Sequence, residues 1–279
     1  MGGFQSKATE IIGRHDCNLP SLPKNIDQQP SLILENKKLL LCGGSNNLQK
    51  CLVLIRGEWF PHSDLNEKRS WASSITNSEG TFILGGYQSP NTWEWLPTGS
   101  TTWKKGAGSI DKGFQRGCAV QGSDLEVILI GGLGTERRIM KFDVSTSRVM
   151  QIGQLNVGRY GHSCIRFQDT IIVTGGEESY NQVLASTELI DLDSLDSRLG
   201  PDMNNPRTRH GLLNLHYNNE ETILALCGEG YQNGKWNVWD SIETWSPEVE
   251  EWIPSTDLKL SKAGHSFGYL STSTNFVCV

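Results

Sequence analysis

The most constraining feature of this sequence is a short apolar run that ends in a glycine pair and recurs along the chain. Glycine pairs follow such runs at positions 43, 85, 131 and 175, and a fifth run is followed by Gly228. Self-similarity at a period of roughly 40 to 50 residues is typical of repeat architectures built from one small unit. The glycine pair suits a close backbone approach or a positive φ angle, both of which a Cβ atom resists.

Each period contains four short segments with the pattern of strands. A polar-to-apolar segment such as 162–165 comes first, and the strand that ends in the glycine pair follows. A third strand, as in 140–144, follows a polar loop, and the fourth carries a bulky residue, as Trp252 follows Trp245. No long window shows helical periodicity. The pattern therefore predicts an all-β fold of four-stranded antiparallel blades.

The order of apolar strand, glycine pair, polar loop, aromatic-Asp or aromatic-Pro turn and Trp resembles the kelch repeat. The clearest copies are 245–252 and 142–146, and the segment Arg-Tyr-Gly-His-Ser at 159–163 is also similar to the start of a kelch repeat. The resemblance extends over nearly the whole chain and implies a β-propeller. The chain departs from the family pattern at 228–230, where the glycine pair is broken, and at Leu199 and Cys17, where the family prefers Trp.

The two ends of the chain contain complementary halves of one blade. Segments 264–267 and 275–279 predict two strands, and 9–12 and 17–20 predict two more. We therefore expect residues 1–279 to form a single six-bladed kelch-type propeller whose last blade is shared between N- and C-terminal strands. Such closure would remove an open sheet edge. The alternative is a fragment of a longer chain, cut inside a blade. The expected blade marks lie near positions 2, 43, 85, 131, 175 and 228.

Composition narrows the classes of partner. A net charge of −6 and a pI near 5.6 do not suit a general nucleic-acid binder, which needs clustered Lys and Arg. No apolar run approaches the ~18 residues of a membrane span. The seven cysteines form no CxxC pair and lie mostly in apolar runs, where Cys acts as a small buried hydrophobe. These features predict a cytoplasmic protein that binds neither nucleic acid nor membranes.

No catalytic constellation is visible, so we expect no enzyme activity, no cofactor and no metal. His162, His210 and His265 occupy equivalent repeat positions. Equivalent points on neighbouring blades are spread around a channel, whereas zinc ligands must converge to about 2.0–2.1 Å, so these histidines are predicted to be structural. The glycine-rich segment 228–234 opens no helix and is predicted to be a flexible loop.

One face of the predicted propeller gathers Arg, Tyr, Asn and Gln, because the loops after the second and fourth strands share it. Arg and Tyr are enriched at binding hot spots, and guanidinium groups bind carboxylates through two hydrogen bonds. The resemblance to peptide-recruiting kelch proteins implies that Arg116 and Arg209 bind acidic side chains of a peptide ligand. Alternatively, repeat arginines brace neighbouring blades through salt bridges. The predicted partner-binding residues are Arg69, Tyr87, Arg116, Arg159, Tyr180, Arg207, Arg209 and Tyr231.

These observations predict a non-enzymatic interaction module, a scaffold, adaptor or substrate receptor, that docks a protein or peptide partner with acidic residues. The kelch resemblance adds ubiquitin-ligase and cytoskeletal components as candidate partners. The alternative function is a carbohydrate-active propeller enzyme, such as an acidic-sugar epimerase, or a protein like the copper oxidases. A cluster of perturbed titratable groups at the channel mouth would favour an enzyme.

Overall fold

The computed structural model describes residues 31–35, 38–44, 48–56, 58–110, 113–123, 125–217, 220–246, 248–256, 270–272 and 275–277. In these ranges the chain forms short antiparallel strands joined by turns. The chain divides into two compact units, Met1–Gln115 with Gly268–Val279 and Arg116–Phe267. No helix of the described residues is long and apolar enough to cross a membrane.

The first unit contains two four-stranded sheets and a hairpin. The first strands of the two sheets, β1 and β5, pack against each other. Blade 1 has the order β1 (Ser31–Glu35), β2 (Lys38–Cys42), β3 (Cys51–Ile55), β4 (Glu58–His62). Blade 2 has the order β5 (Ser73–Asn77), β6 (Gly80–Leu84), β7 (Trp93–Pro97), β8 (Lys104–Lys105). The hairpin pairs β25 (Leu270–Thr272) with β26 (Asn275–Val277).

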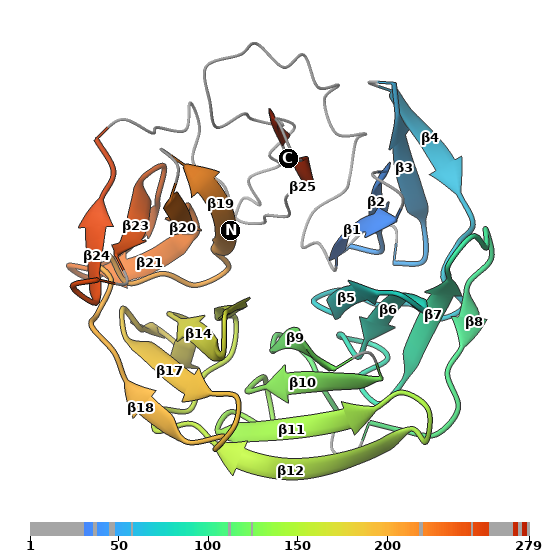
Figure 1. Cartoon of the computed structure of the whole chain (residues 1–279), viewed down its shortest axis with the longest axis horizontal. Helices are drawn as coiled ribbons and strands as arrows, with labels where there is room; N and C mark the ends of the chain where they lie inside the picture. Colours follow the sequence, from blue (N-terminus) through green and yellow to red (C-terminus); the bar gives the residue numbers. More distant parts are fainter. Residues whose placement is uncertain are drawn as a thin grey trace. The chain divides into compact units, whose positions relative to one another are not determined.

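The second unit contains three four-stranded sheets, and their first strands lie innermost and pack on one another (Figure 1). Blade 3 is β9 (Cys118–Ser123), β10 (Glu126–Ile130), β11 (Arg138–Asp143), β12 (Arg148–Gln154). Blade 4 is β13 (Ser163–Phe167), β14 (Thr170–Thr174), β17 (Thr187–Asp191), β18 (Ser197–Leu199). Blade 5 is β19 (Gly211–Tyr217), β20 (Glu220–Leu226), β23 (Ile242–Ser246), β24 (Glu251–Pro254).

Blades 4 and 5 each carry an extra hairpin between their second and third strands. These hairpins are β15 (Glu177–Ser179) with β16 (Gln182–Val183), and β21 (Glu229–Gln232) with β22 (Lys235–Val238). The prediction that 228–234 is a flexible loop is therefore wrong, because this segment forms β21 and its turn. Asn233 and Gly234 both have positive φ angles, 55° and 77°, as a tight two-residue hairpin turn requires.

The predicted order of four antiparallel strands is confirmed in all five described blades. Phe142 pairs with Val149, and Trp245 pairs with Trp252 at 5.3 Å between ring centroids. The strands predicted at 9–12, 17–20 and 264–267 lie outside the described residues. Of the strand predicted at 275–279, the structure describes β26.

The glycine pair marks the joint between one blade and the linker to the next. Gly175 has a φ angle of +61°, and a Cβ there would lie 2.2 Å from the Arg207 carbonyl oxygen in the linker to blade 5. Gly176 donates its N–H to the same carbonyl at 2.7 Å. In blade 5 the pair is Cys227-Gly228, because Gly228 contacts His210 as Gly176 contacts His162. Cys227, with a φ angle of 54°, therefore stands where other copies have their first glycine.

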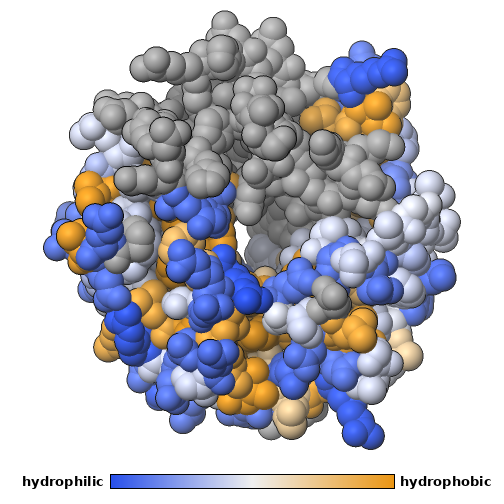
Figure 2. Space-filling view, viewed as in Figure 1, coloured by the Kyte–Doolittle hydropathy of each residue, from blue (hydrophilic) through white to orange (hydrophobic). Residues whose placement is uncertain are grey.

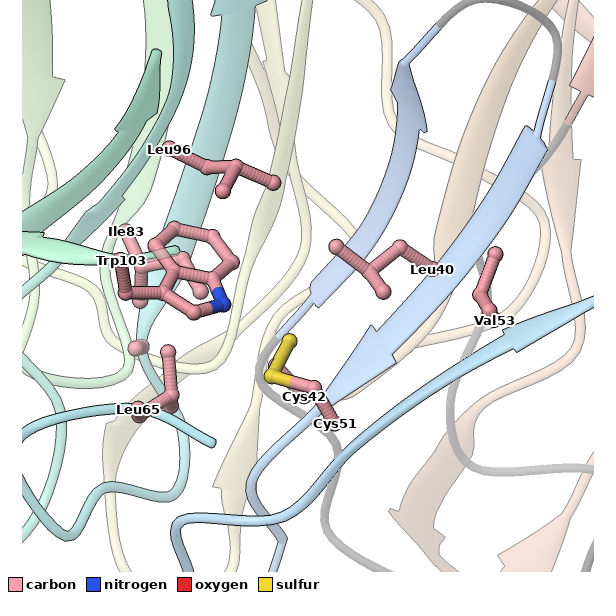
Figure 3. Close-up of a cluster of buried hydrophobic side chains, with 9 residues drawn as sticks. Leu40, Cys42, Cys51, Val53, Leu65, Ile83, Leu96 and Trp103 are labelled. Carbon is pink, nitrogen blue, oxygen red and sulfur yellow. A yellow bond between two sulfur atoms is a disulfide. The ribbon is translucent and has the colours of Figure 1, made fainter. Parts of the chain in front are cut away.

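The core lies in layers between neighbouring blades of each unit. Figure 3 shows the layer of the first unit, where side chains of blades 1 and 2 meet around the Cys42–Cys51 disulfide. In the second unit, one cluster joins blades 3 and 4 and another joins blades 4 and 5. The first unit's cluster contains Leu40, Cys42, Cys51, Val53, Leu65, Ala72, Ile83, Leu96 and Trp103.

Four cysteines form disulfides in the structure. Cys42–Cys51 joins β2 to β3, and Cys118–Cys164 joins β9 to β13. These four residues are cross-links, so the expectation that they act only as small buried hydrophobes is corrected. Disulfides persist mainly in oxidising compartments, so the bridges do not support the cytoplasmic location, which stays a prediction.

Candidate functional site

Three linkers that lead into blades carry a fully buried arginine. Arg69, Arg159 and Arg207 are each 0% exposed. Each forms a salt bridge with a buried glutamate on the third strand of the following blade, namely Glu94, Glu188 and Glu243, at 2.8–2.9 Å. We call this arrangement the linker latch.

The latch into blade 4 shows which groups bind the two buried charges, although Arg159 Nε makes no hydrogen bond. Arg159 donates to Glu188 Oε1 at 2.8 Å and to the carbonyl oxygens of Gly175 and Ser186. The Glu188 carboxylate also accepts the backbone N–H groups of Asn156 and Val157, at 2.7 and 2.9 Å. Burial lowers the pKa of Arg159, and the charge of Glu188 opposes that shift. Because Arg159 donates to backbone carbonyls and Glu188 accepts backbone N–H groups, this buried pair fixes the linker to the next blade.

The linker latch corrects the prediction that Arg69, Arg159 and Arg207 bind a partner. Their guanidinium groups are occupied inside the protein, so they act as the braces between blades that the sequence left as the alternative. The sequence signal for this role is Asn-x-x-Arg at 66–69, 156–159 and 204–207, with a glutamate in the next blade's third strand. In the copy that opens blade 3, the buried residues Phe114 and Met140 stand at the arginine and glutamate positions.

Two further arginines occupy a different position, where the linker backbone turns into the first strand. Arg116 and Arg209 have positive φ angles of 54° and 56°, and Gly161 is the equivalent residue of blade 4. The three are joined by backbone hydrogen bonds, from Gly161 N–H to Arg116 and from Arg209 N–H to Gly161. Trp71, the equivalent residue of blade 2, has a φ angle of 53°, so the left-handed conformation recurs at this position in blades 2 to 5.

The side chains around this ladder form what we call the rim cluster: Arg116, Tyr160, Glu177, Arg209 and Glu229. The Arg116 guanidinium lies over the Tyr160 ring, 5.5 Å from its centroid. Arg209 forms an ion pair with Glu229 at 2.5 Å. Glu177, only 3% exposed, accepts hydrogen bonds from the hydroxyls of Tyr160 at 3.4 Å and Thr208 at 3.1 Å.

The electrostatics of the rim cluster are perturbed. Burial lowers the pKa of Arg116, the nearby charge of Arg209 lowers it further, and Glu177 opposes the shift. Burial raises the pKa of Tyr160, and the Glu177 carboxylate raises it further. The Nε atom of Arg209 is buried and makes no hydrogen bond. Two guanidinium groups beside a phenol can bind an anionic group, in competition with the two resident carboxylates.

The predicted tyrosines lie outside the rim cluster. Tyr87, 53% exposed, contacts Trp71 in the first unit at 6.0 Å between ring centroids. Tyr180 is 74% exposed at the turn between β15 and β16, and Tyr231 lies on β21. Sequence reasoning therefore selected two rim arginines and two hairpin tyrosines of the second unit, and it missed Tyr160 as a site residue. Figure 2 shows hydrophilic residues toward the inner strands of this unit.

Two of the three repeat histidines, His162 and His210, are buried at the joints between blades. His162 is 6% and His210 5% exposed, and His210 Nε2 lies 2.7 Å from the Thr174 hydroxyl. Among the described residues, no group of three His, Cys, Asp or Glu side chains could hold a metal ion. His265 lies outside the described residues. The structural role and the lack of a metal stay predictions.

The buried histidines predict acid sensitivity. Burial, and then the charge of Arg159, lowers the pKa of His162 to about 3. The folded pKa is below the unfolded value of about 6.5, so acid favours the unfolded chain, in which His162 can take up a proton. The free energy of unfolding is therefore unaffected by His162 above pH 6.5 and decreases as the pH falls towards 3. We expect His162 alone to lower the free energy of unfolding by about 2 kcal/mol between pH 7.5 and pH 5.

Urea unfolding of the wild type and of His162→Ala at pH 7.5, 6 and 5 measures this effect. Alanine is the chain's own residue at the equivalent position of blade 2, Ala72. The variant should start less stable and lose less stability on acidification. Equal losses in the two proteins would show that the pKa of His162 is not lowered in the folded protein.

Comparisons with known proteins support the fold. No protein-family model matches the sequence, and no curated protein matches it. Among solved structures, that of YjhT matches with a TM-score of 0.75 and 14% identity, and the match covers 88% of each chain. YjhT is a kelch-repeat β-propeller protein. The match shows that the present chain has a β-propeller fold. At this identity the likeness shows the fold alone, so the activity of the propeller must be argued from its own residues.

Proposed function

We propose that this propeller is a non-enzymatic interaction module that docks a protein or peptide partner through an acidic side chain at the rim cluster. The observation that carries the proposal is the position of Arg116 and Arg209 on hydrogen-bonded backbone on either side of Gly161. Gly161 places no side chain between them. Arginine pairs held in this way suit a carboxylate, which accepts two parallel N–H bonds.

The packing of the two arginines supports binding rather than bracing. Arg209 keeps 34% of its side chain exposed, whereas the linker-latch arginines keep none. Arg116 is half-buried, and its guanidinium lies over the Tyr160 ring, so little side-chain entropy is lost when a ligand binds. Because Glu229 and Glu177 already stand near these groups, an incoming carboxylate competes with them. We therefore expect moderate, salt-sensitive affinity.

A peptide array of 12-residue sequences with and without Asp and Glu tests the proposal. We expect the wild type to prefer acidic peptides. Each arginine should contribute about tenfold in affinity (~1.4 kcal/mol), so Arg116→Ala/Arg209→Ala should bind on the order of 100-fold more weakly.

The matched control is Arg148→Ala, which removes an exposed arginine from β12 of the same unit. This variant should bind acidic peptides like the wild type. If acidic peptides are not preferred, or if the rim double variant keeps its affinity and its melting temperature, the ligand site lies elsewhere.

The wider role of the module belongs to the same proposal. A scaffold, adaptor or substrate-receptor role, with ubiquitin-ligase or cytoskeletal components as partners, is what the kelch resemblance implies. No cofactor, nucleic acid or membrane enters the proposal.

The six-bladed closure over residues 1–279, with the last blade shared between the termini, is also part of the proposal. The hairpin β25–β26, in the same unit as blades 1 and 2, supports this closure.

A second candidate function is catalysis on an acidic sugar. The observation that favours it is the pairing of Tyr160 with Glu177, whose surroundings raise the tyrosine pKa at the rim cluster. An arginine could hold the sugar carboxylate while this pair exchanges a proton. Proton NMR of hexuronic acids with the protein separates the two functions, because only an enzyme would accelerate interconversion of their stereoisomers. No observation favours the copper-oxidase alternative.

A further inference from the structure

The two extra hairpins rise directly from the rim cluster. Glu177 is the first residue of β15, and Glu229 is the first residue of β21. Isolated bridges tie these two residues to the linkers, between Tyr160 and Glu177 and between Thr208 and Glu229. The base of each hairpin is therefore a rim-cluster carboxylate. We call residues 177–183 and 229–238 the hairpin pair.

The hairpin pair is held together by side-chain contacts. The indole N–H of Trp236 donates to Asn181 Oδ1 at 3.1 Å and so links the second hairpin to the first. Tyr231 packs edge-on against Trp236, with 5.7 Å between ring centroids. Strands β16 and β21 also lie in contact. Tight turns and cross-contacts make this a preformed surface, so a partner would order few side chains on binding.

The hairpin pair exposes large apolar groups to solvent. Tyr180 is 74%, Trp236 37% and Val238 38% exposed. The sequence of the hairpin pair is rich in Tyr, Trp, Asn, Gln and Ser. Antibodies use a similar composition to bind proteins. Its exposed charges, Glu178 and Lys235, are opposite in sign, so the hairpin pair offers apolar contact and hydrogen bonds rather than net charge. The charged contacts would come from the rim cluster at its base.

We propose that the hairpin pair binds an apolar side chain of the same peptide whose acidic residue binds the rim cluster. This inference rests on the proposed function. The occupant is an extended peptide segment of a partner protein that carries Asp or Glu close to an aromatic or large aliphatic residue. Continuity supports this choice, because Arg209 pairs with Glu229 at one end of β21 and Tyr231 stands two residues farther along.

The geometry of β21 sets the spacing of the two side chains. At about 3.3 Å per residue, Tyr231 stands about 7 Å from Glu229 along the strand, and the register pairs it with Trp236. An extended peptide that places its carboxylate beside Arg209 would cover the same distance in about two residues. The preferred peptide therefore carries its apolar residue two to four positions from its acidic residue.

An array of 12-residue peptides in a Gly/Ser background, with one Asp and one Trp at separations from one to eight, tests the inference. The wild type should bind best at separations of two to four. Tyr180→Ala and Tyr180→Ala/Trp236→Ala should reduce this preference and weaken the best peptides by about tenfold, while peptides with Asp alone bind as before. Tyr180 is largely exposed, so its substitution leaves the fold intact even if loss of Trp236 loosens the hairpins. Val249→Ala, another exposed apolar residue of the same unit, is the control and should change nothing.

The outcomes separate the two proposals. Acidic preference without any effect of Trp or of its spacing would overturn this inference and leave the proposed function standing. A preference for Trp without Asp would overturn the proposed function, and this inference with it. Binding to immobilised oligosaccharides but to no peptide would overturn both, because the aromatic surface would then serve a sugar.

Discussion

Replacing Glu188 by alanine is expected to destabilise the propeller by about 3–5 kcal/mol. The substitution leaves the fully buried Arg159 charge without its carboxylate, and the N–H groups of Asn156 and Val157 lose their acceptor. Urea unfolding followed by the fluorescence of the nine tryptophans measures the loss. Glu250→Ala is the control, because Glu250 forms an exposed pair with Arg198, and its loss should cost no more than about 1 kcal/mol.

The chain itself supplies a second variant for this prediction. Blade 3 has Phe114 and Met140 at the latch positions, so Arg159→Phe/Glu188→Met transfers its apolar version to blade 4. Because both charges leave together, the double variant should be more stable than Glu188→Ala. If Glu188→Ala loses no more stability than Glu250→Ala, the latch does not hold the blades together.

Removing the Cys118–Cys164 disulfide is expected to lower the free energy of unfolding by about 4 kcal/mol. The bridge joins residues 46 positions apart, and the loop that it closes in the unfolded chain sets this value. The Cys42–Cys51 bridge joins residues only 9 apart, and the same relation gives about 2.5 kcal/mol. The longer bridge should therefore matter more.

Unfolding of Cys118→Ser/Cys164→Ser and of Cys42→Ser/Cys51→Ser, each against the wild type, measures the two effects. Thiol labelling with mass spectrometry shows which bridges the purified protein contains. Wild-type protein that carries labelled Cys118 and Cys164 without any reductant would contradict this prediction.

The strands were predictable because their signals are local. The glycine pairs reveal the end of each second strand, since Gly175 and its equivalents must meet the carbonyl of a neighbouring linker. Trp245 and Trp252 mark a cross-strand pair of blade 5. The turn of the second hairpin also has a local signal, Asn233-Gly234, although the glycine-rich pattern of 228–234 predicts a flexible loop.

The site was only partly predictable because its determinants are distant in the sequence. Arg207 and Arg209 are two residues apart, yet one is fully buried on Glu243 and the other lies at the surface beside Glu229. The difference depends on a glutamate more than 30 positions away in a buried strand. The Cys118–Cys164 disulfide was not predictable either, because these two residues meet only where two inner strands pack together.

The linker latch also defines which segment of the chain can be duplicated with its buried arginine and glutamate both included. Arg159 belongs to the linker before blade 4, while Glu188 belongs to that blade. A copy taken from the first to the fourth strand would carry the glutamate without its arginine, and so would introduce a buried charge with no counterion. A copy of residues 156–203 would carry Asn156, Arg159, Glu188 and Ser197 together. Growth of such a protein by gene duplication is therefore viable with breakpoints in the linkers, just before the asparagine, and not at the ends of the strands.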